Sequence, residues 1–326
     1  MLAIRSDGSR LTADASTPNP DPTPGHALLS LRLATLSHDD LRAARPDSGF
    51  VGTLGHECIA TVERISPDER TPTDAPKRLN NARVLLQPSI PCARCELCQR
   101  GLAAHCPSAL LPGRKGLNGC LSERFTAPIH ALTPIPDALD DERAIMAYAL
   151  ARALHHARVA ALSSTAWATV MGDGPDALLS AQVLSRDHPA TRLLAREESA
   201  IALCAKWGLK HRDASEAGRR QDQDLVLLAS RTPSDFPLAL SFLKPRATLL
   251  LAEPPSAPVS LEDAHAREIR ILSSHAASLA DAIPLLTSGA VDVAPLLGKR
   301  YRLQDAPLAF RDLAQERGPR KPVITP

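Results

Sequence analysis

The sequence predicts two domains, a mostly β first domain and an α/β second domain built on a doubly wound parallel sheet. Up to about residue 137 the apolar segments are short and prolines interrupt them, which is typical of a compact β domain. From about residue 138 strand-like and helix-like segments alternate, which is the pattern of a parallel sheet covered by helices. A chain of 326 residues is long enough for two domains of ordinary size.

In the first domain we expect three strands, at residues 27–35, 58–65 and 83–86. Prolines 18, 20, 22 and 24 disfavour a helix and favour extended coil near the N-terminus. The segment that follows Ser37 predicts a turn into a short helix, with Asp39 or Asp40 as its N-cap. Residues 66–81 are polar and contain three prolines, so they predict a long surface loop.

The second domain is predicted to begin with a helix over 140–160. Repeated strand and helix patterns follow, with strands at 165–171, 191–195, 224–229, 247–252 and 269–272 and helices at 175–185, 197–207, 234–244 and 278–286. This alternation predicts parallel strands with helices on both faces of the sheet. A further helix is expected around 305–316.

Composition excludes several classes of protein. The net charge is only +2 and no basic stripe occurs, so no nucleic-acid partner is expected. No run of about 18 apolar residues occurs, so no membrane span is expected. The N-terminal residues lack the apolar run of a signal peptide. We therefore expect a soluble, cytoplasmic protein.

Four of the seven cysteines, Cys92, Cys95, Cys98 and Cys106, lie within fifteen positions in the pattern C-x2-C-x2-C-x7-C. A looped backbone would let all four thiolates converge on one tetrahedral ion, which predicts a structural zinc site with no open coordination position. Two disulfides are the alternative. They would require an oxidising compartment, which the sequence does not indicate.

The cysteine pattern resembles the structural-zinc lobe of the medium-chain dehydrogenase/reductase superfamily, the zinc-type alcohol dehydrogenases. The resemblance implies a GroES-like domain over 1–137, to which 291–326 returns, and a Rossmann nucleotide-binding domain over 138–290. It also implies hydride transfer between a nicotinamide cofactor and a small alcohol or carbonyl substrate. Members often assemble through the last strand of the Rossmann sheet, so a homodimer or homotetramer is expected, with residues 269–274 and the next helix as the interface.

A glycine-rich turn carries the nucleotide prediction. Gly172, Gly174 and Ala177 form a G-x-G-x-x-A string between a predicted strand and a predicted helix that opens at Pro175. The first glycine permits the tight turn and the second permits close approach of a pyrophosphate, which would sit on the helix N-terminus. Asp176 is unfavourable beside a phosphate. An ordinary glycine turn is the alternative interpretation.

The end of the second Rossmann strand favours NADP(H) over NAD(H). The acidic residue that usually holds the ribose 2′-hydroxyl is absent there, and Arg196 stands in its place. A guanidinium suits a 2′-phosphate. The alternative is that Arg196 is a solvated loop residue.

The chemistry site departs from the family. The resemblance implies a catalytic zinc held by a cysteine, by the histidine of Gly-His-Glu and by a later cysteine or acid. This chain has His56 and Glu57, but Ser37 occupies the cysteine position and Tyr148 the position of the later ligand. Asp39 stands where the family has a proton-relay hydroxyl. A neutral hydroxyl is a poor zinc ligand.

Three readings of this site remain open. His56, Glu57 and Asp39 or His38 would rebuild a zinc site. Alternatively, the second zinc is lost and Tyr148 or His56 donates a proton to a carbonyl or alkene substrate while the fold still binds a nicotinamide nucleotide. In the third, catalysis is lost and the protein is a nucleotide-binding relative with a binding or regulatory role.

Overall fold

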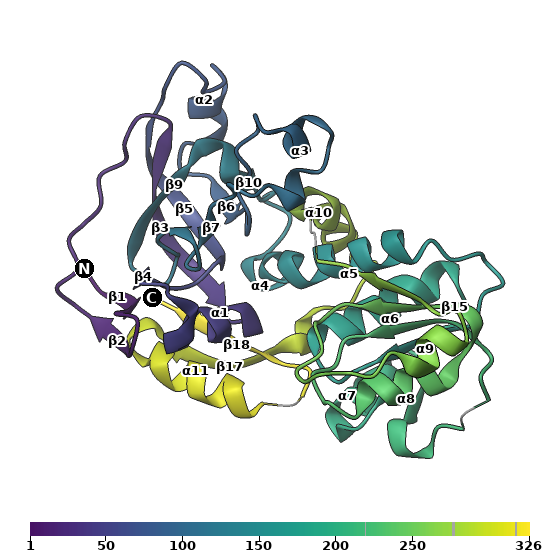
Figure 1. The fold of residues 1–326 in the computed structure, drawn as a ribbon. Helices are drawn as coiled ribbons and strands as arrows, with labels where there is room; N and C mark the ends of the chain where they lie inside the picture. The colour runs from purple at the N-terminus through teal and green to yellow at the C-terminus, as the bar shows by residue number, and fades with distance from the viewer. Residues whose placement is uncertain (219, 276–277, 317) are drawn as a thin grey trace. The chain divides into compact units, whose positions relative to one another are not determined.

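The computed structural model describes residues 1–218, 220–275, 278–316 and 318–326, which form two compact units (Figure 1). Unit 1 comprises Met1–Met146, Leu297–Glu316 and Lys321–Pro326. Unit 2 comprises Ala147–Leu296 and a short segment that ends at Arg320. The boundaries predicted from the sequence are 137 and 290. Helix α4 (Asp141–Ile145) contacts strands of unit 1, so the first boundary lies nine residues later than 137.

Unit 1 is built on a seven-stranded sheet in the order β10-β6-β5-β3-β18-β17, with β9 also paired to β3. Its strands are β3 (His26–Thr35), β5 (Glu57–Ser66), β6 (Arg83–Leu86), β9 (Arg124–Pro128), β10 (Leu132–Pro134), β17 (Leu297–Arg302) and β18 (Lys321–Thr325). Since β18 pairs antiparallel with β3, the C-terminal tail belongs to unit 1. Alternate residues of β3 are buried along most of its length, and Leu29 packs with Val62 and Leu86 in the core.

Two small sheets complete the β structure of unit 1. The first contains β1 (Ala3–Ser6), β2 (Leu11–Asp14) and β4 (Gly52–Thr53). The second contains β7 (Leu111–Pro112) and β8 (Gly116–Leu117). Strands β1 and β2 precede the proline-rich segment and were not predicted. The helices are α1 (His38–Ala43), α2 (Ala75–Leu79), α3 (Glu96–Gln99), α4 and α11 (Ala306–Gln315), with 3-10 turns η1 (Pro46–Ser48), η2 (Ala103–His105), η3 (Ile129–Ala131) and η6 (Leu303–Asp305). Helix α2 lies in the predicted surface loop, where it buries Ala75 and Leu79.

Unit 2 contains a six-stranded, fully parallel sheet in the order β13-β12-β11-β14-β15-β16. The strands are β11 (Ala168–Met171), β12 (Arg192–Ala195), β13 (Lys210–Asp213), β14 (Gln223–Leu228), β15 (Leu243–Leu251) and β16 (Arg270–Ser273). This order, 3-2-1-4-5-6 within the unit, is that of the Rossmann fold. Strand β13 was not predicted, because the residues of this edge strand are polar.

Helices cover both faces of this sheet, as the complete burial of all four β11 residues requires (Figure 1). They are α5 (Ala147–Ala160), α6 (Pro175–Asp187), α7 (Glu198–Lys206), α8 (Asp235–Phe242), α9 (Glu262–Ala266) and α10 (Leu279–Ser288), with 3-10 turns η4 (Ala214–Glu216) and η5 (Ala294–Leu296). The single helix predicted over 140–160 is two helices, α4 and α5, which meet at Met146.

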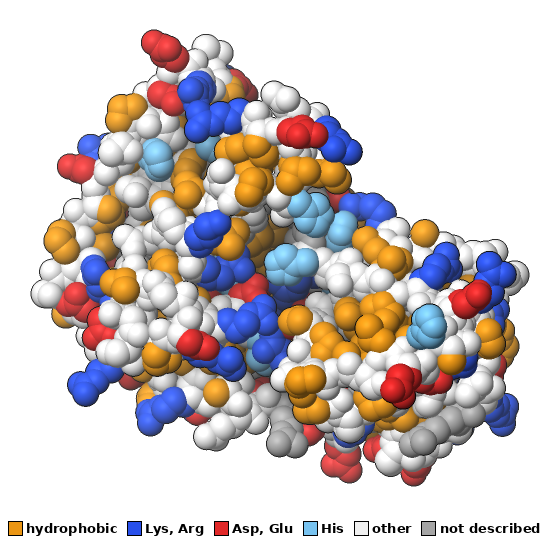
Figure 2. Space-filling view, viewed as in Figure 1, with side chains coloured by type: hydrophobic (Ala, Val, Ile, Leu, Met, Phe, Trp, Pro, Cys, Tyr) orange, Lys and Arg blue, Asp and Glu red, His pale blue; other side chains and the backbone are white. Residues whose placement is uncertain are grey.

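Basic and acidic side chains are intermixed on the face of the molecule that Figure 2 shows. This agrees with the small net charge of +2. Within the described part of the chain, no helix has the length and apolar character needed to cross a membrane.

Candidate functional site

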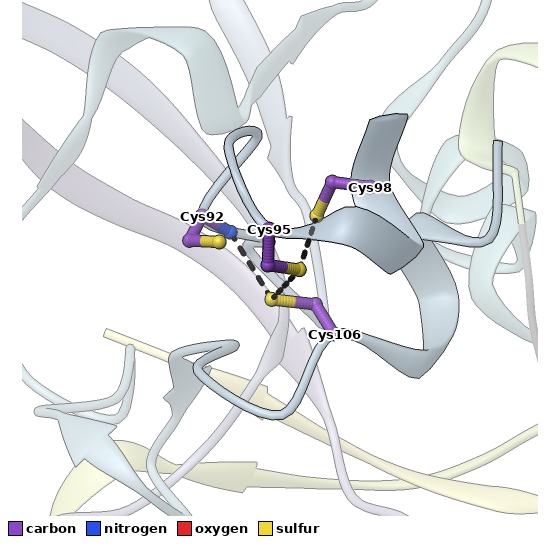
Figure 3. A group of neighbouring side chains, drawn as sticks. All are labelled: Cys92, Cys95, Cys98 and Cys106. Atoms are coloured by element: carbon purple, nitrogen blue, oxygen red, sulfur yellow. Dashed lines mark hydrogen bonds between the residues drawn. The ribbon is translucent and has the colours of Figure 1, made fainter. Parts of the chain in front are cut away.

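The four cysteines of the lobe converge on one point (Figure 3). Cys98 lies on α3, while the other three come from the loops that flank it. The ligand atoms of the four residues all lie within 4.8 Å of one another, and Cys95 Sγ is 3.5 Å from Cys98 Sγ and 3.8 Å from Cys106 Sγ. All four are free thiols, so the predicted disulfide alternative is not formed.

These distances fit zinc. A tetrahedral ion with four Zn–S bonds of ~2.3 Å requires sulfur–sulfur edges of about 3.8 Å. Backbone amides of Arg94 and Cys95 donate to the Cys92 sulfur and lower the pKa of this thiol to about 6, which favours the thiolate. Burial, with hydrogen bonds from the neighbouring thiols, raises the pKa of Cys98 to about 12.

The glycine-rich turn lies between β11 and α6, at the carboxyl end of a central strand. Gly172 has φ +141°, and a Cβ added there would lie 2.3 Å from the carbonyl oxygen of Ala229, so only glycine fits. Gly174 is the N-cap of α6 and Pro175 its first residue. Ala177 is fully buried against the turn. A helix N-terminus that follows a glycine turn in this way is typical of a pyrophosphate-binding site.

Asp176, which we considered unfavourable in a phosphate site, is paired. The Arg152 guanidinium of α5 binds its carboxylate, with Nη2 at 2.9 Å from Oδ1 and Nε at 3.2 Å from both oxygens. The negative charge beside the helix N-terminus is therefore compensated from within unit 2.

Arg196 follows β12 directly, and its guanidinium binds Asp235 of α8 through two nitrogens, with Nη1 at 2.9 Å from Oδ2. Asp235 is buried and raises the pKa of Arg196 further. Asp173, within the glycine turn, accepts hydrogen bonds from the backbone amides of Arg196 at 2.6 Å and Glu197 at 2.8 Å. Arg196 is therefore neither a freely solvated loop residue nor an unpaired cation.

His56 is buried in unit 1 beside the N-terminus of α1. Its Nδ1 lies 2.8 Å from Asp40 Oδ1, and the other oxygen of Asp40 accepts from the backbone amide and hydroxyl of Ser37. Because a carboxylate only accepts, Nδ1 carries the proton and Nε2 faces away from Asp40. The N-cap of α1 is Ser37, not Asp39 or Asp40 as predicted, and Asp40 supplies the reciprocal half of a capping box.

Asp39 lies in a second ion-pair cluster. Its carboxylate binds the guanidinium of Arg42 on the same helix and that of Arg114, whose Nη1 is 2.7 Å from Oδ2. Arg114 also donates to the carbonyl oxygen of Pro88 at 2.5 Å. The position of the family's relay hydroxyl therefore holds a paired, mostly buried carboxylate.

Glu57 is fully buried and binds two groups from distant parts of unit 1. Its Oε2 accepts from Thr35 Oγ1 at 2.7 Å and from the ammonium group of Lys321 on β18. Its Oε1 lies 4.0 Å from His56 Nε2, beyond hydrogen-bond distance.

The residues of unit 1 do not fit a catalytic zinc. Such a site needs three protein ligands and an open position. The Ser37 hydroxyl donates to Asp40 and accepts from the Asp39 amide, and both Asp39 oxygens bind arginines. Across residues 1–218, 220–275, 278–316 and 318–326, the lobe cysteines are the single group of three or more His, Cys, Asp or Glu side chains placed to hold a metal. Tyr148, the remaining candidate, is buried in α5 of unit 2.

Residues 23–137 match the family model of the alcohol dehydrogenase GroES-like domain. Sorbitol dehydrogenase from Arabidopsis thaliana is 24% identical over 270 residues, which are 76% of this chain and 72% of that protein. An alcohol dehydrogenase from E. coli CFT073, solved with NADH, superposes with a TM-score of 0.85 at 20% identity over 100% of this chain and 99% of the other. L-idonate 5-dehydrogenase from Escherichia coli K-12 gives a TM-score of 0.86 at 18% identity, over 99% and 97% of the two chains.

The fold, the lobe and the glycine turn define a two-domain oxidoreductase of alcohol dehydrogenase type. These similarities support the resemblance to the medium-chain dehydrogenase/reductase superfamily, with a GroES-like domain at residues 23–137.

Five residues shape these sites but were not identified from the sequence as site residues: Asp40, which was expected only as an N-cap, Arg114, Lys321, Asp173 and Asp235. The Ser-x-x-Asp spacing of a capping box would have indicated Asp40. The others act through contacts between segments far apart in sequence, for which a single sequence carries no local signal.

Proposed function

We propose that this oxidoreductase transfers hydride between a nicotinamide nucleotide and a carbinol or carbonyl carbon of a small polyhydroxylated substrate, with zinc only in the lobe. The glycine turn carries this proposal, because Gly172 and the N-terminus of α6 form a phosphate site at the carboxyl end of β11. The substrate class is supported by the relatives named sorbitol and L-idonate dehydrogenase.

The nucleotide, when bound, supplies or accepts the hydride. The chain's own contribution is to position it: the turn admits the pyrophosphate at the helix end, and Arg152 removes the repulsion from Asp176. Four thiolates at the lobe would hold zinc with a closed coordination shell, so this metal stabilises the lobe and takes no part in hydride transfer.

His56 is the proton-handling group that unit 1 offers. Asp40 fixes the tautomer by accepting from Nδ1, so Nε2 exchanges the proton of the substrate hydroxyl. Tyr148 is the second candidate, as a phenol donor contributed by unit 2. Glu57 and Asp39 are held in ion pairs and would fix the charge around His56 without donating protons.

The alternative is an inactive nucleotide-binding relative with a binding or regulatory role. One observation favours it: Ser37 and Asp39, which take the places of a metal ligand and a relay hydroxyl, are both fully engaged in structural hydrogen bonds. The two proposals share the nucleotide site and differ only in hydride transfer.

Two measurements test the proposal on the full chain. Elemental analysis should give close to one zinc per chain. NADH and NADPH oxidation, followed by absorbance with a panel of ketoses and small aldehydes, should be detectable and should fall by roughly 10²-fold or more in His56→Gln. His130→Gln, which changes an exposed histidine of the same unit, is the matched control.

Two zinc ions per chain would show that a catalytic metal binds after all. One zinc and no hydride transfer, with nucleotide binding retained, would favour the inactive relative.

Assembly remains a proposal. Strand β16 ends the parallel sheet of unit 2, and Leu272 on it is 40% exposed. An edge strand with an exposed leucine suits pairing with a second copy of the chain. We therefore propose a homodimer, or a homotetramer of such dimers, that light scattering should detect and Leu272→Lys should dissociate; a monomeric wild-type protein would contradict this. Location in the cytoplasm likewise remains a prediction.

A further inference from the structure

The end of β12 holds a carboxylate that the sequence did not reveal. Asp173 belongs to the glycine turn, yet its Oδ1 accepts the backbone amides of Arg196 and Glu197, the two residues that follow β12. This pair of hydrogen bonds fixes the Asp173 carboxylate where β12 ends. Among the described residues, its Oδ2 has no hydrogen-bond partner.

The guanidinium at the same place is already neutralised. Arg196 binds Asp235 through both terminal nitrogens, and the Asp235 side chain is only 1% exposed. Ser230 donates its hydroxyl to Asp235 as well, so the orientation of this carboxylate is fixed independently of Arg196. A bidentate arginine–carboxylate pair with a buried acid is costly to separate.

The surrounding charge is negative. Asp213, at the end of the neighbouring strand β13, is held ionised by hydrogen bonds from Ser215, which lower its pKa, and it acts electrostatically on Arg196. Three carboxylates, those of Asp173, Asp213 and Asp235, therefore act on the single positive charge of Arg196. A 2′-phosphate carries about −1.5 to −2 charges at neutral pH. It would gain little from an arginine already in an ion pair and would be repelled by the other two carboxylates.

We propose that Asp173 and Asp235 together select NAD(H) over NADP(H): Asp173 supplies from the glycine turn the ribose-binding carboxylate that the second strand lacks, and Asp235 withholds Arg196 from a 2′-phosphate. This inference rests on the proposed nicotinamide nucleotide function. It removes both premises of the NADP(H) prediction, because a carboxylate is present at the end of β12 and the guanidinium there is occupied.

The test is direct binding of NADH and NADPH to the purified full chain, by nicotinamide fluorescence and calorimetry. Wild type should bind NADH roughly tenfold or more tightly than NADPH. Asp235→Asn should release Arg196 and strengthen NADPH binding by roughly tenfold, with little change for NADH. Asp173→Asn keeps the acceptor for the two backbone amides but loses the charge, and should weaken NADH binding by roughly tenfold.

Asp224→Asn is the matched control. Asp224 is a carboxylate of the same unit, paired with Lys244 at the amino end of β14, away from the nucleotide end of the sheet. Its substitution should leave the NADH/NADPH ratio unchanged. Circular dichroism and thermal unfolding of each variant establish folding, and the more exposed Asp173→Asn tests the proposal if Asp235→Asn does not fold.

Tighter binding of NADPH than NADH by wild type would overturn the inference while leaving the proposed function intact. So would an unchanged affinity ratio in both folded variants. Failure of wild type to bind either nucleotide would instead overturn the proposed function, and the inference with it.

Discussion

Two regions of unit 1, the cysteine lobe and the surroundings of His56, arrange their polar side chains in opposite ways. The lobe at Cys92–Cys106 keeps four thiols within 4.8 Å of one another. The region around His56 keeps a histidine and fills the remaining positions with ion pairs, in which Asp39 meets Arg42 and Arg114 and Glu57 meets Lys321. We therefore expect the lobe to depend on a metal for its shape, whereas the His56 region is held together by its own side chains.

The difference shows what each site is needed for. A short lobe with little apolar core requires a cation to bring its thiolates together. The His56 region lies on β3, β5 and β18 of the main sheet, so it folds without a metal provided that each buried charge has a partner. The fold of the His56 region is therefore expected not to require a metal.

The largest effect should follow removal of the lobe metal. Zinc bound by structural thiolate sites contributes apparent energies of ~10–16 kcal/mol in small peptides. We expect a chelator, or Cys95→Ser, to make residues 84–112 sensitive to limited proteolysis while the rest of unit 1 stays resistant. Cys204→Ser, a buried cysteine of unit 2, is the control and should change nothing in the lobe. If the lobe stayed resistant to the protease after metal removal, it would not depend on a metal for its shape.

The ion pairs of the second region should matter next. Lys321→Met removes the buried cation from Glu57, whose side chain is 0% exposed. Breaking a buried pair in this way costs ~3–5 kcal/mol of unfolding free energy, measurable by denaturant titration. Lys299→Met breaks a pair in which the lysine is 71% exposed, so solvent screening should make its effect on the unfolding free energy much smaller. Equal losses in the two variants would show that the buried pair has no special role.

Acid should lower the stability of unit 2 as well as that of the two regions of unit 1, so a pH titration does not distinguish the two regions. Burial lowers the pKa of His156 to about 4, below its usual value of 6.5. The folded state therefore favours the neutral ring: this stability is fully present above pH 6.5 and is lost as the pH falls toward 4. We expect the free energy of unfolding to fall by roughly 2 kcal/mol between pH 7 and 5. His156→Gln should flatten this profile and the exposed His211→Gln should not. An identical slope in wild type and His156→Gln would refute the assignment.

The smallest effect should come from Ser37, which caps α1. Ser37→Ala should cost ~1 kcal/mol, visible as a lower melting temperature. Ser37→Cys tests whether one thiol is enough to bind a second zinc, because it introduces a sulfur but leaves Asp39 bound to two arginines. We expect its zinc content to stay near one per chain. A zinc content near two per chain would mean that the serine at position 37 alone prevents binding of a second zinc.

The sequence was sufficient where interactions are local. The lobe could be predicted because four ligands within fifteen residues converge through a short loop. Strands β3 and β14 could be predicted because apolar residues recur with the period of a half-buried or fully buried strand. Strand β13 escaped detection since its residues Lys210–Asp213 are polar and become a strand only by pairing with β12.

The candidate sites were predictable only in part. His56 and the glycine turn were identified from motifs, and so was the absence of a cysteine at Ser37. The partners that determine what these residues do were not. Lys321 lies 264 positions from Glu57, and Arg114 lies 75 positions from Asp39.

The sequence alone indicated the resemblance to alcohol dehydrogenases, the order of the two units, the cysteine lobe and the glycine turn, because each depends on residues close together in the chain. Tertiary structure alone decided that Asp39 is held by Arg114, that Glu57 is neutralised by Lys321 and that Asp173 occupies the end of β12. The physical reason is that a buried charge depends on its partner in space, and distant segments supply that partner only once the sheets have formed.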